Sequence, residues 1–257
     1  MCLILFAYRS HPEYRLILAA NRDEFFARPT EPLAFWPDEP EILAGRDLQA
    51  GGTWFGLSAD GRFAAVTNFR DPSNTALDAL SRGGIPVDYL KSGLSPQEFC
   101  LAARNDWHRY NGFNLLAGDG ESLVYASNRT GQTQELSPGM YGLSNHLLDT
   151  EWPKVRLGKE KLRQMLTDSR SFDPENLFTL LEDTWQPPDS MLPDTGIGTD
   201  WEHLLAPLFI RGRDYGTRSS LILIVRQNGE AVCIERTFAH AQGIALETGR
   251  KRLELNF

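Results

Sequence analysis

The chain has 257 residues, of which 41% are hydrophobic, and a formal net charge of −8. This length is enough to bury one large core, so we expect a single domain spanning residues 1–257. The balance of 34 acidic against 26 basic side chains argues against binding to nucleic acid or to an anionic membrane surface, because both need a basic patch.

The positions of the cysteines and histidines narrow the class of protein further. Cys2, Cys100 and Cys233 lie far apart and form no CxxC motif, which indicates neither a disulfide framework nor a zinc site. The histidines show no metal-ligand spacing, so we expect no metal site and no required cofactor. No stretch approaches the roughly 18 apolar residues of a spanning helix, and the start lacks a basic signal-peptide region. We therefore expect a cytoplasmic protein without a membrane span; no heptad or apolar edge indicates its oligomeric state.

The first predicted elements are strands. Leu3 to Tyr8 and Arg15 to Ala20 are apolar runs on either side of turn-forming residues, which predicts a hairpin. The proline-rich stretch that follows, to about Leu48, predicts an irregular surface excursion. Gly51-Gly52 indicates a close backbone approach, and Arg62 to Phe69 follow a turn and predict a strand.

Helices are predicted where capping residues precede an apolar periodicity. Ser95, followed by proline, starts a helix to about Arg104 that has Cys100 on its apolar face. Pro153 opens a second helix that reaches about Thr167. Its apolar side contains Val155, Leu162, Met165 and Leu166, and its polar side contains Lys154, Lys159, Glu160 and Arg163. A further capped helix ends near Leu181, and a loop rich in proline and glycine follows at residues 186–198.

The remaining apolar runs predict strands in the second half of the chain. Phe113 to Ala117 and Ser122 to Ser127 form a second hairpin, and Tyr141 to Ser144 form a short strand. Ser219 to Val225 is an unbroken apolar run, typical of a strand buried on both faces, and Ala231 to Thr237 follow it across a turn. Strands at both ends with helices between them predict an α+β fold in which sheet packs on sheet and helices lie outside.

The residue with the clearest chemical potential is Cys2. Removal of Met1 leaves Cys2 with a thiol nucleophile and, on the same residue, a free α-amine whose pKa near 8 suits a general base. The alternative is that Cys2 is a small apolar residue at the start of a buried strand. With Met1 attached, the residue has no free amine and cannot act as its own base.

Polar residues at predicted strand ends are candidates to assist the thiol. Asn21, Arg22, Asp23 and Glu24 follow the second strand of the hairpin and return to the start of the first; the alternative is a charged turn. Asp23 can orient an α-ammonium, and Arg22 can lower the thiol pKa or bind a substrate carboxylate.

Further candidates come from other strand ends. Asn68 and Asn145 can each offer a side-chain amide to an oxyanion, or serve as ordinary turn residues. Arg218 enters a buried run and needs a partner or a ligand; an ion pair with Asp23 is the structural alternative. His146, beside Asn145, is the histidine best placed to line a pocket.

Several of these residues fall in motifs that resemble the transport and Golgi organisation protein 2 family, also called the NRDE family. The resemblance spans essentially the whole chain. Its motifs are Met1-Cys2-Leu3-Ile4, Asn21-Arg22-Asp23-Glu24, Gly45-Arg46-Asp47, Gly51-Gly52-Thr53-Trp54, Val66-Thr67-Asn68, Tyr141-Gly142-Leu143-Ser144-Asn145 and Thr217-Arg218-Ser219-Ser220.

The family is similar to the N-terminal nucleophile hydrolases, which implies a four-layer αββα sandwich. The resemblance implies that Cys2 is nucleophile and base, and that Asp23 orients the amine. It implies oxyanion amides at Asn68 and Asn145 and an arginine near the thiol at Arg218. Those hydrolases have an arginine where this chain has Ala20; either Arg22 takes that role or thiol activation is absent. The residues expected to bind substrate are Asn21, Glu24, Trp54 and His146.

Two functions of different class are expected from these residues. One is hydrolysis of a non-peptide C–N amide bond in a small molecule by Cys2. The other is non-catalytic carriage, because the resemblance implies a link to haem or acyl-lipid handling and the aromatic residues around Trp36 and Trp54 can build an apolar pocket. In this second function, haem is a ligand that the protein carries. A structural or assembly factor with no small ligand is a third class.

Overall fold

The computed structural model describes residues 2–168, 173–241 and 244–257. In these ranges the strands form two antiparallel sheets, and the chain divides into two compact units. Unit 1 comprises Met1–Ala27, Ser137–Ser144 and Leu148–Asn256, and unit 2 comprises Arg28–Leu136, Asn145–Leu147 and Phe257. Each unit contains one sheet and its own helices, so the α+β class is confirmed. Because the chain passes between the units more than once, neither is a contiguous segment, and the single domain over 1–257 stays a prediction.

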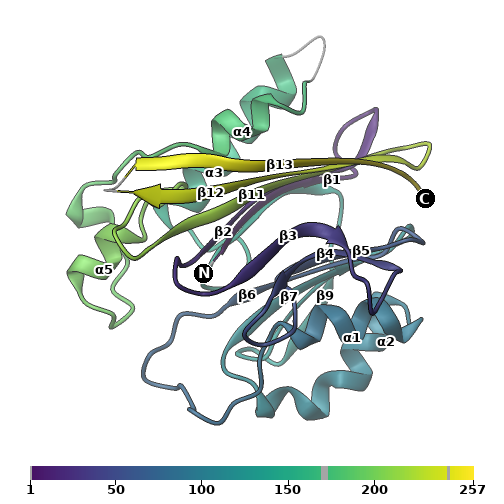
Figure 1. Ribbon diagram of the computed structural model, residues 1–257, viewed down its shortest axis with the longest axis horizontal. Helices are drawn as coiled ribbons and strands as arrows, with labels where there is room; N and C mark the ends of the chain where they lie inside the picture. The colour runs from purple at the N-terminus through teal and green to yellow at the C-terminus, as the bar shows by residue number, and fades with distance from the viewer. Residues whose placement is uncertain (1, 169–172, 242–243) are drawn as a thin grey trace. The chain divides into compact units, whose positions relative to one another are not determined.

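Unit 1 is built on a six-stranded sheet in the order β10-β1-β2-β11-β12-β13 (Figure 1). The strands are β1 (Cys2–Tyr8), β2 (Tyr14–Phe25), β10 (Gly139–Leu143), β11 (Tyr215–Arg226), β12 (Glu230–Ala241) and β13 (Ile244–Asn256). The predicted first hairpin is confirmed, with Tyr8 opposite Leu16. The prediction that β2 ends at Ala20 is wrong, because the strand continues to Phe25.

The helices of unit 1 are α3 (Pro153–Asp168), α4 (Asn176–Leu181) and α5 (Thr199–Leu204), with a short 3-10 turn, η2 (Asp189–Met191). The start of α3 at Pro153 was predicted. Gly158 of α3 approaches Leu5 of β1 so closely that a Cβ on Gly158 would lie 2.5 Å from the leucine side chain. Side chains at alternate positions of β1, including Leu3 and Leu5, share one buried core with Leu162 of α3. One face of this sheet is therefore the helix-covered face.

Unit 2 is built on a seven-stranded sheet whose strands lie in chain order from β3 to β9. They are β3 (Thr30–Phe35), β4 (Ile42–Asp47), β5 (Phe55–Ser58), β6 (Phe63–Asn68), β7 (Phe113–Gly118), β8 (Leu123–Ser127) and β9 (Gln132–Glu135). The predicted irregular excursion up to Leu48 is wrong, because β3 and β4 occupy it. Proline is tolerated there because β3 is an edge strand, and Pro32 lies where its pairing with β4 is interrupted between Glu31 and Ala34.

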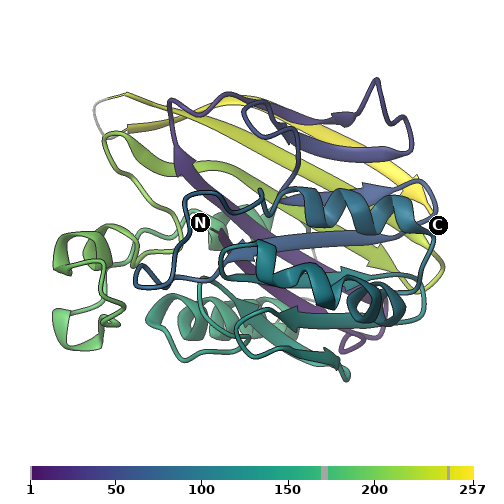
Figure 2. The same cartoon turned by 90° about the horizontal axis from the view of Figure 1, so that it is seen from below.

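The helices of unit 2 are α1 (Gly84–Ser92) and α2 (Pro96–Ala103), followed by a 3-10 turn, η1 (Arg104–Arg109). Figure 2 shows α1 and α2 side by side on one face of the unit. The cap of α2 is as predicted: the Ser95 hydroxyl accepts a hydrogen bond from the Glu98 amide, and the Glu98 carboxylate accepts one from the Ser95 amide. Cys100 is fully buried in the core of this unit, as expected.

Candidate functional site

Cys2 is the first residue of β1, a strand paired with β10 on one side and with β2 on the other. The residue is 6% exposed. Its direct partner across the ladder is Arg22 of β2, so the two side chains lie on the same face of the sheet. The Ser144 hydroxyl donates to the Cys2 carbonyl at 3.2 Å. The backbone of the candidate nucleophile is therefore fixed from two neighbouring segments.

The tetrad Asn21–Glu24 lies inside β2, whereas the sequence predicted that it follows the strand. Strand alternation then divides it between the two faces of the sheet. Arg22 shares a face with Cys2, and Asn21 and Asp23 share the helix-covered face with Leu3. The thiol and the Asp23 carboxylate therefore lie on opposite faces of the sheet.

Asn21 is fully buried and its side chain is engaged within unit 1. Its Nδ2 donates to the carbonyls of Leu181 at 2.8 Å and Leu208 at 2.9 Å. The Ser220 hydroxyl donates to Asn21 Oδ1 at 2.6 Å. These bonds tie the centre of the sheet to the end of α4 and to the segment before β11, which gives Asn21 a structural role.

Asp23 is 1% exposed and is held by β11. The Thr217 hydroxyl donates to Asp23 Oδ1 at 2.7 Å, and the Tyr215 hydroxyl donates to the Asp23 carbonyl at 3.0 Å. Burial raises the pKa of the Asp23 carboxyl, and the positive charge of Lys154 opposes this rise. The site therefore contains a buried acid whose ionisation depends on a nearby cation.

Arg22 and Arg218 bring positive charge to the same end of β2. The Arg22 side chain is 8% exposed, its Nη2 lies 3.9 Å from the Glu24 carboxylate, and its buried Nη1 has no hydrogen-bond partner among the residues that the structure describes. Arg218 lies inside β11 at a β-bulge between Thr217 and Ser219, not ahead of the strand as predicted. Its Nη1 donates to the carbonyls of Phe25 at 2.9 Å and Phe26 at 3.1 Å.

The surroundings of Cys2 favour the protonated thiol over the thiolate. Burial raises its pKa; the negative charges of Asp23 and Glu24 add to this effect, and the positive charge of Arg22 opposes it. A buried, protonated thiol needs a base at the moment of attack.

The other predicted site residues belong to unit 2. Asn145 Nδ2 donates to the Asn68 carbonyl at 3.0 Å, so the structure brings these two residues together. The ring of His146 lies 4.8 Å from that of Phe69, and burial lowers the pKa of the histidine. Trp54 is half-buried beside Phe55. The set Cys2, Asn21, Arg22, Asp23, Glu24 and Arg218 is assembled in unit 1.

The Gly-Gly-Thr-Trp motif packs backbone against backbone, as the sequence predicted. A Cβ on Gly52 would lie 2.4 Å from the carbonyl of Gly83, and Thr53 donates its amide to that carbonyl at 3.0 Å. This contact fixes the start of α1. The motif therefore has a structural function in unit 2.

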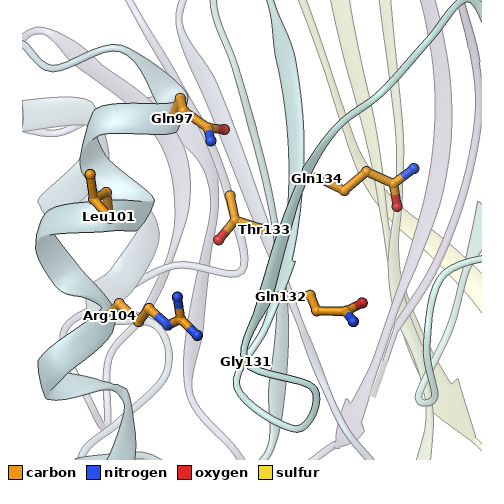
Figure 3. A pocket seen from close by; sticks show the side chains of 7 residues that line it. All are labelled: Gln97, Leu101, Arg104, Gly131, Gln132, Thr133 and Gln134. Carbon is orange, nitrogen blue, oxygen red and sulfur yellow. The ribbon is translucent and has the colours of Figure 1, made fainter.

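Neither the cavity between α2 and β9 nor the one beside residues 74–80, both in unit 2, contains a predicted site residue. The larger, about 560 Å³, lies between α2 and β9, where Thr133 points toward the helix (Figure 3). It is lined by Gln97, Leu101, Arg104, Gly131, Gln132, Thr133 and Gln134. The smaller, about 380 Å³, borders the loop at residues 74–80. Over residues 2–168, 173–241 and 244–257, no group of three His, Cys, Asp or Glu side chains is arranged to hold a metal ion. Within those same ranges, no helix is both long and apolar enough to cross a bilayer.

Sequence reasoning missed Lys154. We placed it on the polar side of its helix, but it is 2% exposed, and its Nζ donates to the Leu205 carbonyl at 2.9 Å. The spacing along the helix could have indicated its burial. Lys154 lies four residues before Gly158 and eight before Leu162, so the three residues lie on one side of the helix. Both Gly158 and Leu162 face the core, and Lys154 lies on their side of the helix.

Comparison with known proteins identifies the family. The model of the family described as Transport and Golgi organisation 2 matches residues 1–240. A Transport and Golgi organization 2 homolog from Mus musculus is 36% identical over 258 residues, which cover 92% of this chain and 93% of the relative. The Homo sapiens homolog is 35% identical over 260 residues, with the same shares covered.

Among solved structures, a conjugated bile acid hydrolase from Clostridium perfringens aligns with a TM-score of 0.49 and 10% identity, over 100% of this chain and 97% of that one. A TM-score below 0.5 adds nothing to the evidence from the relatives. Those relatives are more than 30% identical over nearly the whole chain. The resemblance seen in the motifs is thus confirmed, and the chain belongs to the Transport and Golgi organisation 2 family.

Proposed function

We propose that this protein is an amidase that uses Cys2 as an N-terminal nucleophile on a non-peptide C–N amide bond. The observation that carries the proposal is the arrangement at the start of β1. The thiol of Cys2 faces one side of the sheet beside Arg22, and the buried carboxylate of Asp23 lies on the other side. The backbone of Cys2 belongs to the strand that separates these two faces.

The proposed reaction begins after removal of Met1, which lies outside the described residues. The neutral α-amine takes the thiol proton, and Sγ forms a bond to the amide carbonyl carbon. The tetrahedral oxyanion collapses, the C–N bond breaks, and the leaving nitrogen takes the proton from the α-ammonium. Water then attacks the thioester, the α-amine accepts its proton, and the thiol and a carboxylic acid are released.

Each charged neighbour has a defined part in this proposal. Asp23, held by the Thr217 hydroxyl, stabilises the α-ammonium that forms when the thiol is deprotonated. Arg22 stabilises the thiolate on the other face, because its charge lowers the pKa of the thiol. The oxyanion role of Asn68 and Asn145 stays a prediction.

Labelling of the nucleophile tests the proposal. Untagged protein is produced with methionine aminopeptidase, the loss of Met1 is checked by intact mass, and the protein is treated with a β-lactone and with a panel of N-acyl amides. We expect one label on Cys2 and amide turnover, both abolished by Cys2→Ala. Cys233→Ala is the matched control, since that thiol is fully buried and burial raises its pKa.

The same samples distinguish hydrolysis from carriage of haem or an acyl lipid. Carriage does not need the free amine, so a carrier binds its ligand equally well with Met1 retained and in the Cys2→Ala variant. Amide turnover that persists in Cys2→Ala, or a protein that keeps Met1 in full, overturns the amidase proposal.

A further inference from the structure

Lys154 is the second residue of α3, and it is a buried cation. Removing an ammonium group from water costs several kcal/mol unless an opposite charge and hydrogen bonds replace the lost hydration. The hydrogen bond to the Leu205 carbonyl replaces only part of it, because an ammonium has three donors. An anion near Lys154 is therefore expected on physical grounds.

The packing of unit 1 connects Lys154 to Asp23. Leu205, whose carbonyl binds Lys154, packs in one buried cluster with Ile210 and Tyr215. The Tyr215 hydroxyl donates to the Asp23 carbonyl. The Ile210 amide donates to the Thr217 hydroxyl at 2.9 Å, and that hydroxyl in turn donates to the Asp23 carboxylate. Lys154 and Asp23 thus belong to one contiguous buried assembly on the helix-covered face.

Among the side chains around Asp23, Lys154 is the main countercharge to its carboxylate. Arg22 lies on the same strand, the Cys2 thiol lies on β1, and Lys154 comes from α3. The effect of Lys154 on the carboxyl is larger than that of the Thr217 hydrogen bond or of Arg22. The helix α4, which also packs against β2, has no titratable residue (NLFTLL). Lys154 is therefore the side-chain cation that most strongly opposes the effect of burial on the Asp23 carboxyl.

We propose that Lys154 is a positioning residue that keeps Asp23 ionised, so that Asp23 can hold the α-ammonium of Cys2 during catalysis. This inference rests on the proposed function. Without the lysine charge, the buried Asp23 takes up a proton at higher pH than in the wild type, and the protonated acid no longer stabilises the ammonium. Lys154 itself touches neither the thiol nor a substrate.

The first measurement is the titration of the Asp23 carboxyl by carbon NMR, assigned by comparison with Asp23→Asn. Lys154→Gln retains a donor for the Leu205 carbonyl and removes the charge, so it separates the two roles of the lysine. An opposite charge nearby lowers the pKa of a carboxyl, so the loss of the lysine charge in Lys154→Gln raises the Asp23 midpoint. Lys154→Arg retains the charge and keeps the midpoint near that of the wild type.

The matched control is Lys161→Gln in the same helix. Lys161 is 41% exposed and pairs with Asp183, so its removal leaves the Asp23 midpoint unchanged. If Lys154→Gln does not fold, the reciprocal experiment replaces it: Asp23→Asn lowers the pKa of the Lys154 ammonium, read from its Cε signal. An Asp23 midpoint that is the same in Lys154→Gln and wild type, or a Lys154 pKa that is unchanged in Asp23→Asn, overturns the inference.

The second measurement is the pH dependence of Cys2 labelling. Labelling falls as pH drops through the Asp23 pKa, so this acid limb moves to higher pH in Lys154→Gln and stays in place in Lys161→Gln. Wild-type protein that lacks Met1 and never labels at any pH contradicts the proposed function. The carboxyl titration does not depend on labelling, so it still decides whether Lys154 controls Asp23.

Discussion

Replacing Asn21 by aspartate tests whether this residue is structural. Asn21→Asp preserves size and leaves an acceptor for the Ser220 hydroxyl, but it removes both donors that bind the carbonyls of Leu181 and Leu208. Each buried carbonyl that loses its partner costs about 1–3 kcal/mol, which gives about 4 kcal/mol for the pair. For a chain of this length that corresponds to a fall in melting temperature of roughly 8–16 °C.

Thermal unfolding followed by circular dichroism measures the effect. Ser220→Ala is the matched control, since it removes one hydrogen bond and leaves both carbonyls satisfied; its expected cost is about 1–2 kcal/mol. The loss of about 4 kcal/mol predicts a much larger shift than 2 °C. An Asn21→Asp protein that melts within about 2 °C of the wild type therefore refutes the structural role. In that case the amide becomes a substrate-binding candidate again.

Three further outcomes are expected. Gly52→Ala places a methyl group 2.4 Å from the Gly83 carbonyl, so it lowers the yield of soluble protein or the melting temperature sharply, whereas Gly84→Ala meets nothing within 4 Å and leaves both unchanged. Arg62→Met removes the hydrogen bonds from Arg62 to the carbonyls of Tyr89 in α1 and of Leu94 just after it, and it costs about 2–4 kcal/mol in urea unfolding; a loss below about 0.5 kcal/mol contradicts a stabilising role of these bonds. Burial raises the pKa of Cys100 to about 12, so at pH 8 its thiol remains protonated and resists iodoacetamide in the native state; rapid native-state alkylation at this position disproves it.

The parts of the fold that could be predicted are those with local causes. The cap at Ser95 and the turn between β1 and β2 follow from hydrogen bonds and dihedral preferences within a few residues. The edge strand β9 was missed because its residues, Gln132–Glu135, are polar and largely exposed, and no apolar alternation marks such a strand.

The positions of the candidate site residues could not be predicted from local causes. The sequence placed Asn21 and Asp23 after a strand because polar residues in a row are typical of turns. They lie inside β2 because distant segments satisfy them: the carbonyls of Leu181 and Leu208, and the hydroxyl of Thr217. Lys154 was misplaced for the same reason, since it is buried and binds the Leu205 carbonyl, which lies outside its own helix. The chemical groups available at the site could be predicted from the residue types. The burial of these residues could not, because it depends on partners that are distant in the sequence.

The strand that begins with Cys2 acquires its neighbours at very different times during synthesis. Its hairpin partner β2 follows at once, but β10 is completed only at Leu143, and β11, which closes the other side of β2, only at Arg226. At about 5–20 residues per second the ribosome needs roughly 10–45 s to reach that point. Until then, β1 and β2 lack neighbours that they have in the folded sheet, where Cys2 is buried. For the proposed amidase, removal of Met1 therefore competes with closure of the sheet around Cys2, which is buried in the folded protein.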